Sequence, residues 1–285
     1  MAESAFILLL IAAVFARYKK PALWWTGAYI ASIISAYLTS IIDIPGVIFA
    51  VALISLSQYH SHIFDLHRHF SFNLWKTVVW ATLLILSLLL ATHVAPGFNN
   101  LLIHDELVLS QNSTSFSIYA NYDKALVGMA LLLLIANGSH QHKTSFSSGI
   151  SILGITAIVV LGTATLLGYI EWNPKFEGVF FTWALTNLLI TCLAEEAFFR
   201  LLVQEQILRW CSGFAYKEWL AIICSASLFG LAHLSGGADY AVLAAMAGIC
   251  YAYIYNHYKS IEIAVISHFT VNALHFLLFT YPAKV

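Results

Sequence analysis

Long apolar stretches follow one another along most of the chain. Read with a window of about 19 residues, they form ten segments, at residues 5–16, 22–42, 44–60, 74–93, 125–137, 150–170, 178–203, 217–235, 240–257 and 260–281. A helix that crosses a bilayer needs roughly 17–25 apolar residues, so the segments 5–16 and 125–137 are marginal. The pattern predicts an all-α fold, a polytopic transmembrane helical bundle with about 8–10 spans.

The longest polar interruption lies at residues 94–123. It contains Asp105, Glu106 and the polar stretch Asn112-Ser-Thr, which predict a surface loop rather than a separate domain. Leu and Phe residues in the same segment indicate that it rests on the membrane interface. We therefore expect a single integral membrane domain over residues 1–285.

The composition supports a membrane protein. Hydrophobic residues make up 60% of the chain and charged residues only 9%, with a mean hydropathy of +0.82. A soluble domain would carry about 25% charged residues. The net charge of −1 argues against nucleic acid as a partner, which would require a basic face. The expected partner is the lipid bilayer.

Basic residues predict the orientation in the membrane. If all ten segments cross, one side holds only Lys124, Lys175 and Lys284, and the other holds Arg17, Lys19, Lys20, Arg68, Lys76, Lys143, Arg209, Lys217 and Lys259. The second side should be cytoplasmic, because positive charge accumulates there. The chain is compact and has no long cytoplasmic domain, so a bacterial inner membrane is expected rather than the endoplasmic reticulum.

The string Glu195-Glu196-Ala-Phe-Phe-Arg200 places ionisable groups inside an apolar segment. Such groups are costly in hydrocarbon and indicate a functional site. Helical periodicity separates the two carboxylates by about 100°, whereas Glu196 and Arg200 can meet on one face at their spacing of four. Glu196 is therefore predicted to be a structural ion, and Glu195 a candidate general base. A charge cluster at the membrane surface is the alternative.

Two further strings, Phe229-Gly-Leu-Ala-His233 and His268-Phe-Thr-Val-Asn272, lie in later apolar segments. The first places an aromatic ring one helical turn before a histidine. A single histidine in a membrane helix is also typical of a hydrogen-bonded packing residue. The second places two polar side chains one turn apart, and both need the bundle interior or a water-filled cavity.

The order E-E-x-x-x-R, F-x-x-x-H and H-x-x-x-N on successive apolar segments resembles the CPBP family, the CAAX proteases and bacteriocin-processing proteases also called Abi proteins. The resemblance implies a catalytic core at about residues 178–281, with the helices of residues 1–177 as accessory elements. It implies a catalytic centre formed by Glu195, His233, His268 and Asn272. The supporting residues are Glu196, Arg200 and Phe229. We expect the four catalytic groups to surround one cavity.

The predicted function is that of a hydrolase, an intramembrane endopeptidase that cuts a membrane-anchored protein or peptide. Peptide hydrolysis needs a base that activates water and donors that hold the oxyanion. Glu195 with His233 could supply the first, and His268 with Asn272 the second. The family has been described both as metalloproteases and as glutamate-dependent proteases. The cofactor therefore stays open: His233, His268 and Glu195 would form a plausible ligand set for a divalent metal such as zinc.

Two other interpretations remain at this stage. A proton-coupled membrane transporter would use buried glutamate and histidine as a proton relay. Transporters of that kind usually show paired, repeat-related broken helices, whereas the polar groups here concentrate in one third of the chain. A non-catalytic membrane adaptor would keep the motifs only to hold helices together.

Overall fold

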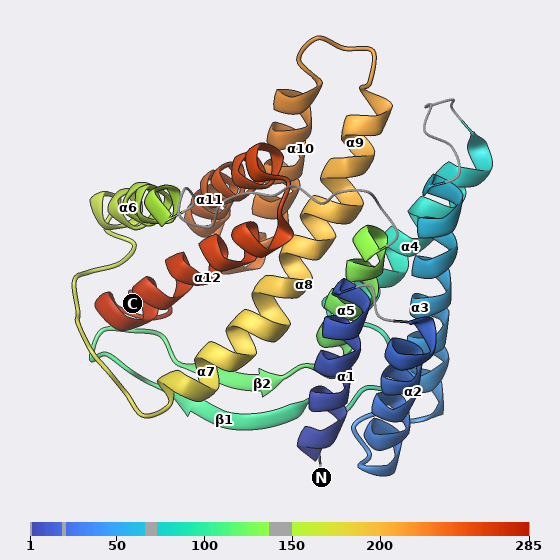
Figure 1. The fold of residues 1–285 in the computed structure, drawn as a ribbon. Coiled ribbons are helices and arrows are strands. Elements are labelled where there is room, and N and C mark those ends of the chain that lie inside the picture. The colour runs from blue at the N-terminus through green and yellow to red at the C-terminus, as the bar shows by residue number, and fades with distance from the viewer. Residues whose placement is uncertain (1, 19–20, 66–72, 137–149, 285) are drawn as a thin grey trace. The chain divides into compact units, whose positions relative to one another are not determined.

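The computed structural model of the protein describes residues 2–18, 21–65, 73–136 and 150–284 (Figure 1). Contacts divide the chain into two compact units. Unit 1 consists of Met1–Leu101, Ala120–His140 and Leu193–Ser212, and unit 2 of Leu102–Tyr119, Gln141–Cys192 and Gly213–Val285. The expectation of a single integral membrane domain stays a prediction. Of the basic residues that predict the orientation, Lys19, Lys20, Arg68 and Lys143 lie outside the described residues.

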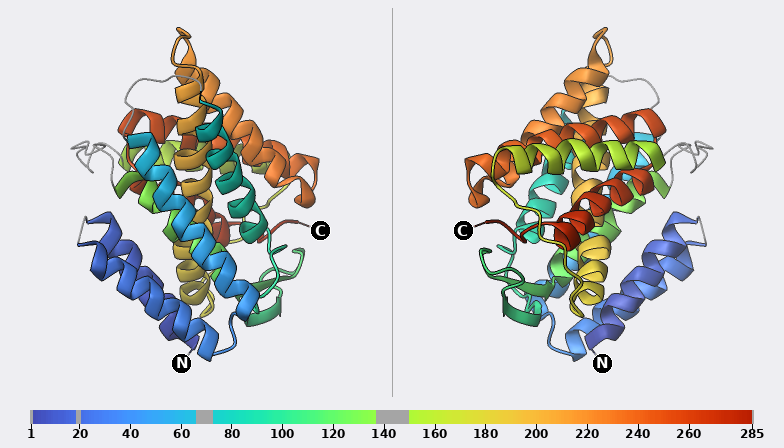
Figure 2. Two further views of the ribbon diagram at one scale, coloured as in Figure 1. Left: turned by 90° about the vertical axis from the view of Figure 1, so that its right-hand side faces the viewer. Right: turned by 90° about the vertical axis from the view of Figure 1, so that its left-hand side faces the viewer.

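Unit 1 is built from helices. They are α1 (Ala2–Arg17), α2 (Ala22–Leu38), α3 (Ile44–Asp65), α4 (Leu74–Ala91), α5 (Tyr122–Ala136), α8 (Leu193–Glu196), the π-helix η3 (Ala197–Gln204) and α9 (Glu205–Trp210). Helices α1 and α2 lie side by side (Figure 2). Helix α5 contacts α1, α3, α4, α8 and η3. Beyond Asp123 and Lys124 in its first turn it is apolar on all sides, as expected for a helix that is surrounded by others, and Leu126, Val127 and Ala130 are fully buried.

Unit 2 combines a small sheet with helices. Its elements are β1 (Leu101–Leu107), β2 (Phe116–Ala120), α6 (Ile150–Leu166), α7 (Phe180–Thr186), the π-helix η2 (Asn187–Cys192), α10 (Lys217–Ala232), the short 3₁₀-helix η4 (Leu234–Gly236), α11 (Ala238–Tyr258) and α12 (Ile261–Leu278). Helix α11 packs against α10, α12 and α6, and α6 and α11 are seen side by side in Figure 2.

The polar segment 94–123 differs from the surface loop that its sequence predicts. Strands β1 and β2 pair into a two-stranded sheet within it (Figure 1). Ile118 of β2 is buried in a cluster with Trp183 of α7 and Phe276 of α12. The Leu, Ile and Phe residues of this segment therefore cover the core of unit 2. This packing accounts for their apolar character without a contact to the membrane interface.

The all-helical class is confirmed, because each of the ten apolar segments contains a helix. In the described part of the chain, four helices are long and apolar enough to cross a membrane: Ile44–Phe64, Leu74–Ala91, Ala238–Tyr258 and Ile261–Leu278. Two shorter apolar helices cover Ala22–Leu38 and Ser151–Leu166. The protein is therefore a membrane protein, and the number of its spans stays a prediction.

Candidate active site

The first motif lies in a helical run with unusual backbone geometry. Helical structure is continuous from Phe180 to Trp210, but η2 and η3 are π-helical, and only the single turn of α8 separates them. That turn carries Glu195 and Glu196. π-Helical segments are rare and are found frequently at functional sites. The backbone around the two carboxylates thus marks the same place as the sequence motif.

Glu196 and Arg200 form the ion pair that their spacing predicts. Arg200 Nε donates to Glu196 Oε2 at 2.8 Å, and both side chains are fully buried. Arg200 Nη1 also donates to Gln204 Oε1 at 3.4 Å. A buried ion is tolerated only when it is paired and hydrogen-bonded. The pairing is therefore confirmed, whereas its purely structural role stays a prediction.

Glu195 has a partner that the sequence motifs did not identify. Lys124 Nζ of α5 donates to Glu195 Oε1 at 2.7 Å, and the two side chains are only 15% and 16% exposed. The two neighbouring carboxylates thus bind different cations, as their angular separation on a helix suggests. Lys124 precedes Glu195 by 71 residues, so helical periodicity could not reveal this contact.

Small residues let α5 and α8 approach each other closely in unit 1. A Cβ atom added to Gly128 would lie 3.3 Å from the backbone N and Cα of Ala194. Lys124 and Gly128 are four residues apart on one face of α5, and Ala194 directly precedes Glu195. The glycine therefore sets the distance across which Lys124 reaches the carboxylate.

His233 lies at the end of α10 rather than within it, as the residue that follows Ala232. Its Nδ1 lies 2.7 Å from the carbonyl oxygen of Phe229. A carbonyl can only accept, so Nδ1 carries a proton and donates it, which leaves Nε2 as the nitrogen that can accept a proton when the ring is neutral. The Phe229 ring lies 4.6 Å from the imidazole. The one-turn spacing of the motif thus provides both the orientation and the tautomer of His233.

The ring of His268 is buried among aromatic side chains of unit 2. It stacks on the ring of Tyr251 of α11, with 4.7 Å between the ring centroids, and it meets the ring of Phe229 edge-on, with 5.7 Å between the centroids. Phe229 therefore contacts both motif histidines. Tyr251 is a site residue that the motifs missed, and its place among apolar neighbours gave no signal in the sequence.

A glycine inside the second motif allows α10 and α11 to pack closely. A Cβ atom at Gly230 would come within 2.7 Å of Ala241 O and of Ala245 Cβ. A side chain at this position would force the two helices apart. Gly230 thus fixes α11, the helix that carries Tyr251, against the end of α10.

Asn272 lies one turn after His268 on α12, as the third motif predicts. Its side-chain amide donates to Asn187 Oδ1 at 3.2 Å and lies 3.7 Å from Cys192 Sγ. Both partners belong to the π-helix η2. They are two further residues that the motifs did not include, and they fix the orientation of the Asn272 amide.

The family comparison covers this part of the chain. Residues 177–274 match the family model described as type II CAAX prenyl endopeptidase Rce1-like. The resemblance to the CAAX endopeptidases is confirmed. No curated protein and no solved structure gives a match. The match covers about a third of the chain, and the CAAX endopeptidases to which it is similar are proteases that act on membrane-associated proteins.

All three motifs lie inside the CAAX endopeptidase match, and Lys124 lies outside it. Glu195, Glu196 and Arg200 belong to unit 1, and Phe229, His233, His268 and Asn272 to unit 2. The single cavity expected for the catalytic groups stays a prediction. Among the described residues, no group of three His, Cys, Asp or Glu side chains is arranged to hold a metal ion. The metal ligand set of His233, His268 and Glu195 stays a prediction.

Proposed function

We propose that the protein is an intramembrane endopeptidase that hydrolyses a peptide bond in a membrane-associated protein. The observation that carries the proposal is the occurrence of all three motifs, in order, within the stretch that matches the CAAX endopeptidases. Long apolar helices support a location in the membrane. We expect the bacterial inner membrane as the site of action.

In this proposal Glu195 and His233 activate the attacking water. The tautomer of His233 supports its part, because a ring that donates through Nδ1 to Phe229 O keeps its basic nitrogen at Nε2. Glu195 is the proton acceptor, and its carboxylate is held by Lys124. His268 and Asn272 donate to the oxyanion that develops on the scissile carbonyl.

The test is a substitution that removes the proton acceptor at position 195 but keeps the shape of the side chain. General-base loss typically lowers the rate about 100- to 10,000-fold, so Glu195→Gln should stop cleavage and leave substrate binding intact. His233→Ala should fail likewise. The measurement is hydrolysis of a fluorogenic peptide in proteoliposomes, with one version ending in a prenylated CAAX sequence and another presenting an apolar leader segment.

Glu171→Gln is the matched control, because Glu171 pairs with Lys284 at an exposed site outside the motifs. It should cleave at the wild-type rate. A chelator added to the wild type decides between the two catalytic types, since it abolishes activity only if a metal takes part. Cleavage by Glu195→Gln at the wild-type rate would refute the proposed role of Glu195.

The proton-coupled transporter is the rival function. A transporter would carry a solute across the vesicle membrane even when peptide cleavage is absent. Proton-driven solute uptake by wild-type proteoliposomes, together with no cleavage, would favour it, and Glu195→Gln should then stop the uptake. An adaptor without catalytic activity would show neither cleavage nor uptake.

A further inference from the structure

We propose that Lys124 is a positioning residue for Glu195, and this inference rests on the proposed function. Its ammonium donates to Glu195 Oε1 at 2.7 Å, and the pair is largely withdrawn from solvent. Lys124 comes from α5, outside the stretch that matches the endopeptidase family. A helix assigned only an accessory role would then supply a part of the catalytic machinery.

The place of Lys124 on α5 is unfavourable for the helix itself. Lys124 is the third residue of α5, and a cation in the first turn lies at the positive end of the helix dipole. Lysine is also among the residues least often buried without a partner. The stability of α5 therefore does not explain a largely buried lysine at this position. The ion pair with Glu195 does explain it.

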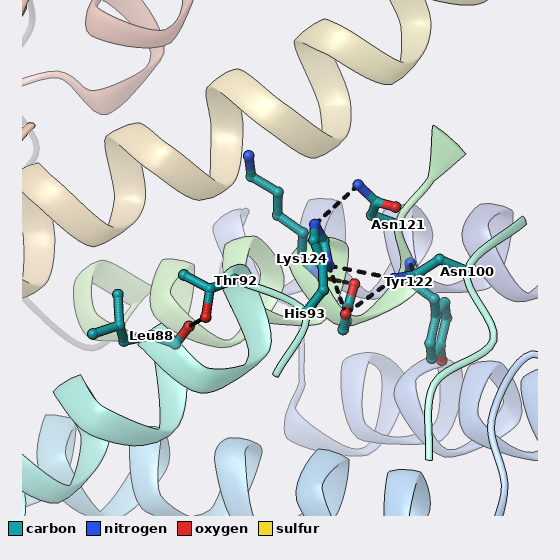
Figure 3. Close-up of polar contacts among 8 residues, drawn as sticks. Leu88, Thr92, His93, Asn100, Asn121, Tyr122 and Lys124 are labelled. Atoms are coloured by element: carbon teal, nitrogen blue, oxygen red, sulfur yellow. Dashed lines mark hydrogen bonds and ion pairs between the residues drawn. The ribbon is translucent and has the colours of Figure 1, made fainter. Parts of the chain in front are cut away.

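A hydrogen-bond network fixes the backbone from which Lys124 extends (Figure 3). Asn100 Oδ1 accepts from the Tyr122 backbone N–H at 2.9 Å, and Asp123 Oδ1 accepts from the Lys124 backbone N–H at 2.8 Å. Asp123 Oδ2 in turn accepts from His93 Nδ1 at 2.8 Å and from Asn100 Nδ2 at 3.1 Å. The first turn of α5 is thus held through both backbone and side chains.

Two further contacts tie this turn to the rest of unit 1. The Tyr122 hydroxyl lies 2.7 Å from Ser32 Oγ of α2. The close approach of Gly128 to Ala194 holds α5 against α8. Lys124 therefore lies between two fixed points, and its ammonium reaches Glu195 from a defined direction. Such a contact restricts the rotation of the carboxylate about its side-chain bonds.

The expected consequence is a loss in turnover rather than in binding. A small misplacement of a reacting group can cost about 100-fold in rate. Lys124→Met should lower kcat about 10- to 100-fold and leave KM within about twofold, because Lys124 acts on the base and not on the substrate. Lys124→Arg keeps the charge and should recover part of the loss, short of the full rate because guanidinium geometry differs.

The experiment compares Lys124→Met, Lys124→Arg, Glu195→Gln and the double variant Lys124→Met/Glu195→Gln in the full chain. Cleavage of the proteoliposome peptide gives kcat and KM, and thermal unfolding gives an activity-independent reading. Residues in contact show non-additive effects, so the double variant should lose less thermal stability than the sum of the single losses. Lys284→Met is the control, because it removes the exposed pair with Glu171 and should leave kcat unchanged.

The outcomes separate this inference from the proposed function. An active wild type with an unchanged kcat in Lys124→Met overturns the inference and leaves the endopeptidase intact. Additive stability losses, with a folded yield that falls as much as the rate, would make Lys124 merely structural. A wild type that cuts neither peptide defeats the proposed function and the positioning role of Lys124 with it, while the unfolding data still show whether the ion pair forms.

Discussion

The carboxylates in unit 1 and the histidines in unit 2 are held by different kinds of contact. Glu195 and Glu196 each bind a cation, Lys124 and Arg200. His233 and His268 instead contact aromatic rings, and His233 also a backbone carbonyl. A cation nearby favours the ionised carboxylate. The two carboxylates are thus held by ion pairs, whereas the two imidazoles are held by ring packing and, for His233, by a hydrogen bond.

The largest effect is expected when the ion pair between Glu196 and Arg200 is removed. Arg200→Ala leaves a fully buried carboxylate without its cation, and breaking such a pair typically costs about 3–5 kcal/mol. We expect a lower unfolding temperature and a lower folded yield. Replacing both partners by apolar residues, as in Glu196→Leu/Arg200→Met, should restore much of the stability. If the Arg200→Ala protein folds normally but does not cleave, Arg200 takes part in catalysis and its role is not purely structural.

The aromatic contacts of the histidines depend on the close packing of α10 and α11, the helices that carry Phe229 and Tyr251. Gly230→Ala would place a methyl group within 2.7 Å of Ala241 O and Ala245 Cβ, and overpacking of this kind costs about 1–3 kcal/mol. Gly154→Ala in α6 is the control, because nothing lies within 4 Å of its added Cβ. That change should be neutral or stabilising by up to about 1 kcal/mol. Equal unfolding temperatures for the two variants would contradict the packing argument.

The elements that the sequence predicts correctly are those set by local pattern. Apolar runs of helical length gave all ten helical regions, because the membrane leaves few other structures for such runs. The pair of Glu196 and Arg200 follows from a spacing of four. The π-helical turns around α8 do not follow, since no residue pattern distinguishes them from an α-helix. The same holds for the sheet of β1 and β2, whose mixed composition resembles that of a loop.

The contacts that the sequence could not give are those between distant segments. Lys124 reaches Glu195 across 71 residues, and Asn187 reaches Asn272 across 85. Both depend on how helices pack, which a single sequence does not encode as a pattern. The motifs therefore identified the candidate catalytic groups, while the residues that hold three of them (Lys124 for Glu195, Tyr251 for His268 and Asn187 for Asn272) became visible only in the structure.

The smallest effect is expected for the hydrogen bond between Asn187 and Asn272. Its removal tests whether a specific partner orients Asn272, as specific partners hold the charged groups. Asn187→Ala removes the acceptor at 3.2 Å from the Asn272 amide, and a hydrogen bond of this kind contributes about 0.5–1.5 kcal/mol. If Asn272 holds the oxyanion, cleavage should fall by about tenfold or less, since the amide keeps its chemistry and loses only its direction.

Asn187→Asp is the informative partner variant for this last test, because it keeps an acceptor oxygen at the same position. It should retain more activity than Asn187→Ala in the same peptide assay. Asn256→Ala is the control outside the motifs, since it removes hydrogen bonds with Glu218 and Lys259 in the same unit and should leave the cleavage rate unchanged. Equal activity of Asn187→Ala and wild type would mean that η2 does not orient Asn272 for the reaction. The contact would then serve packing alone, and the oriented groups would be reduced to Glu195 and the two histidines.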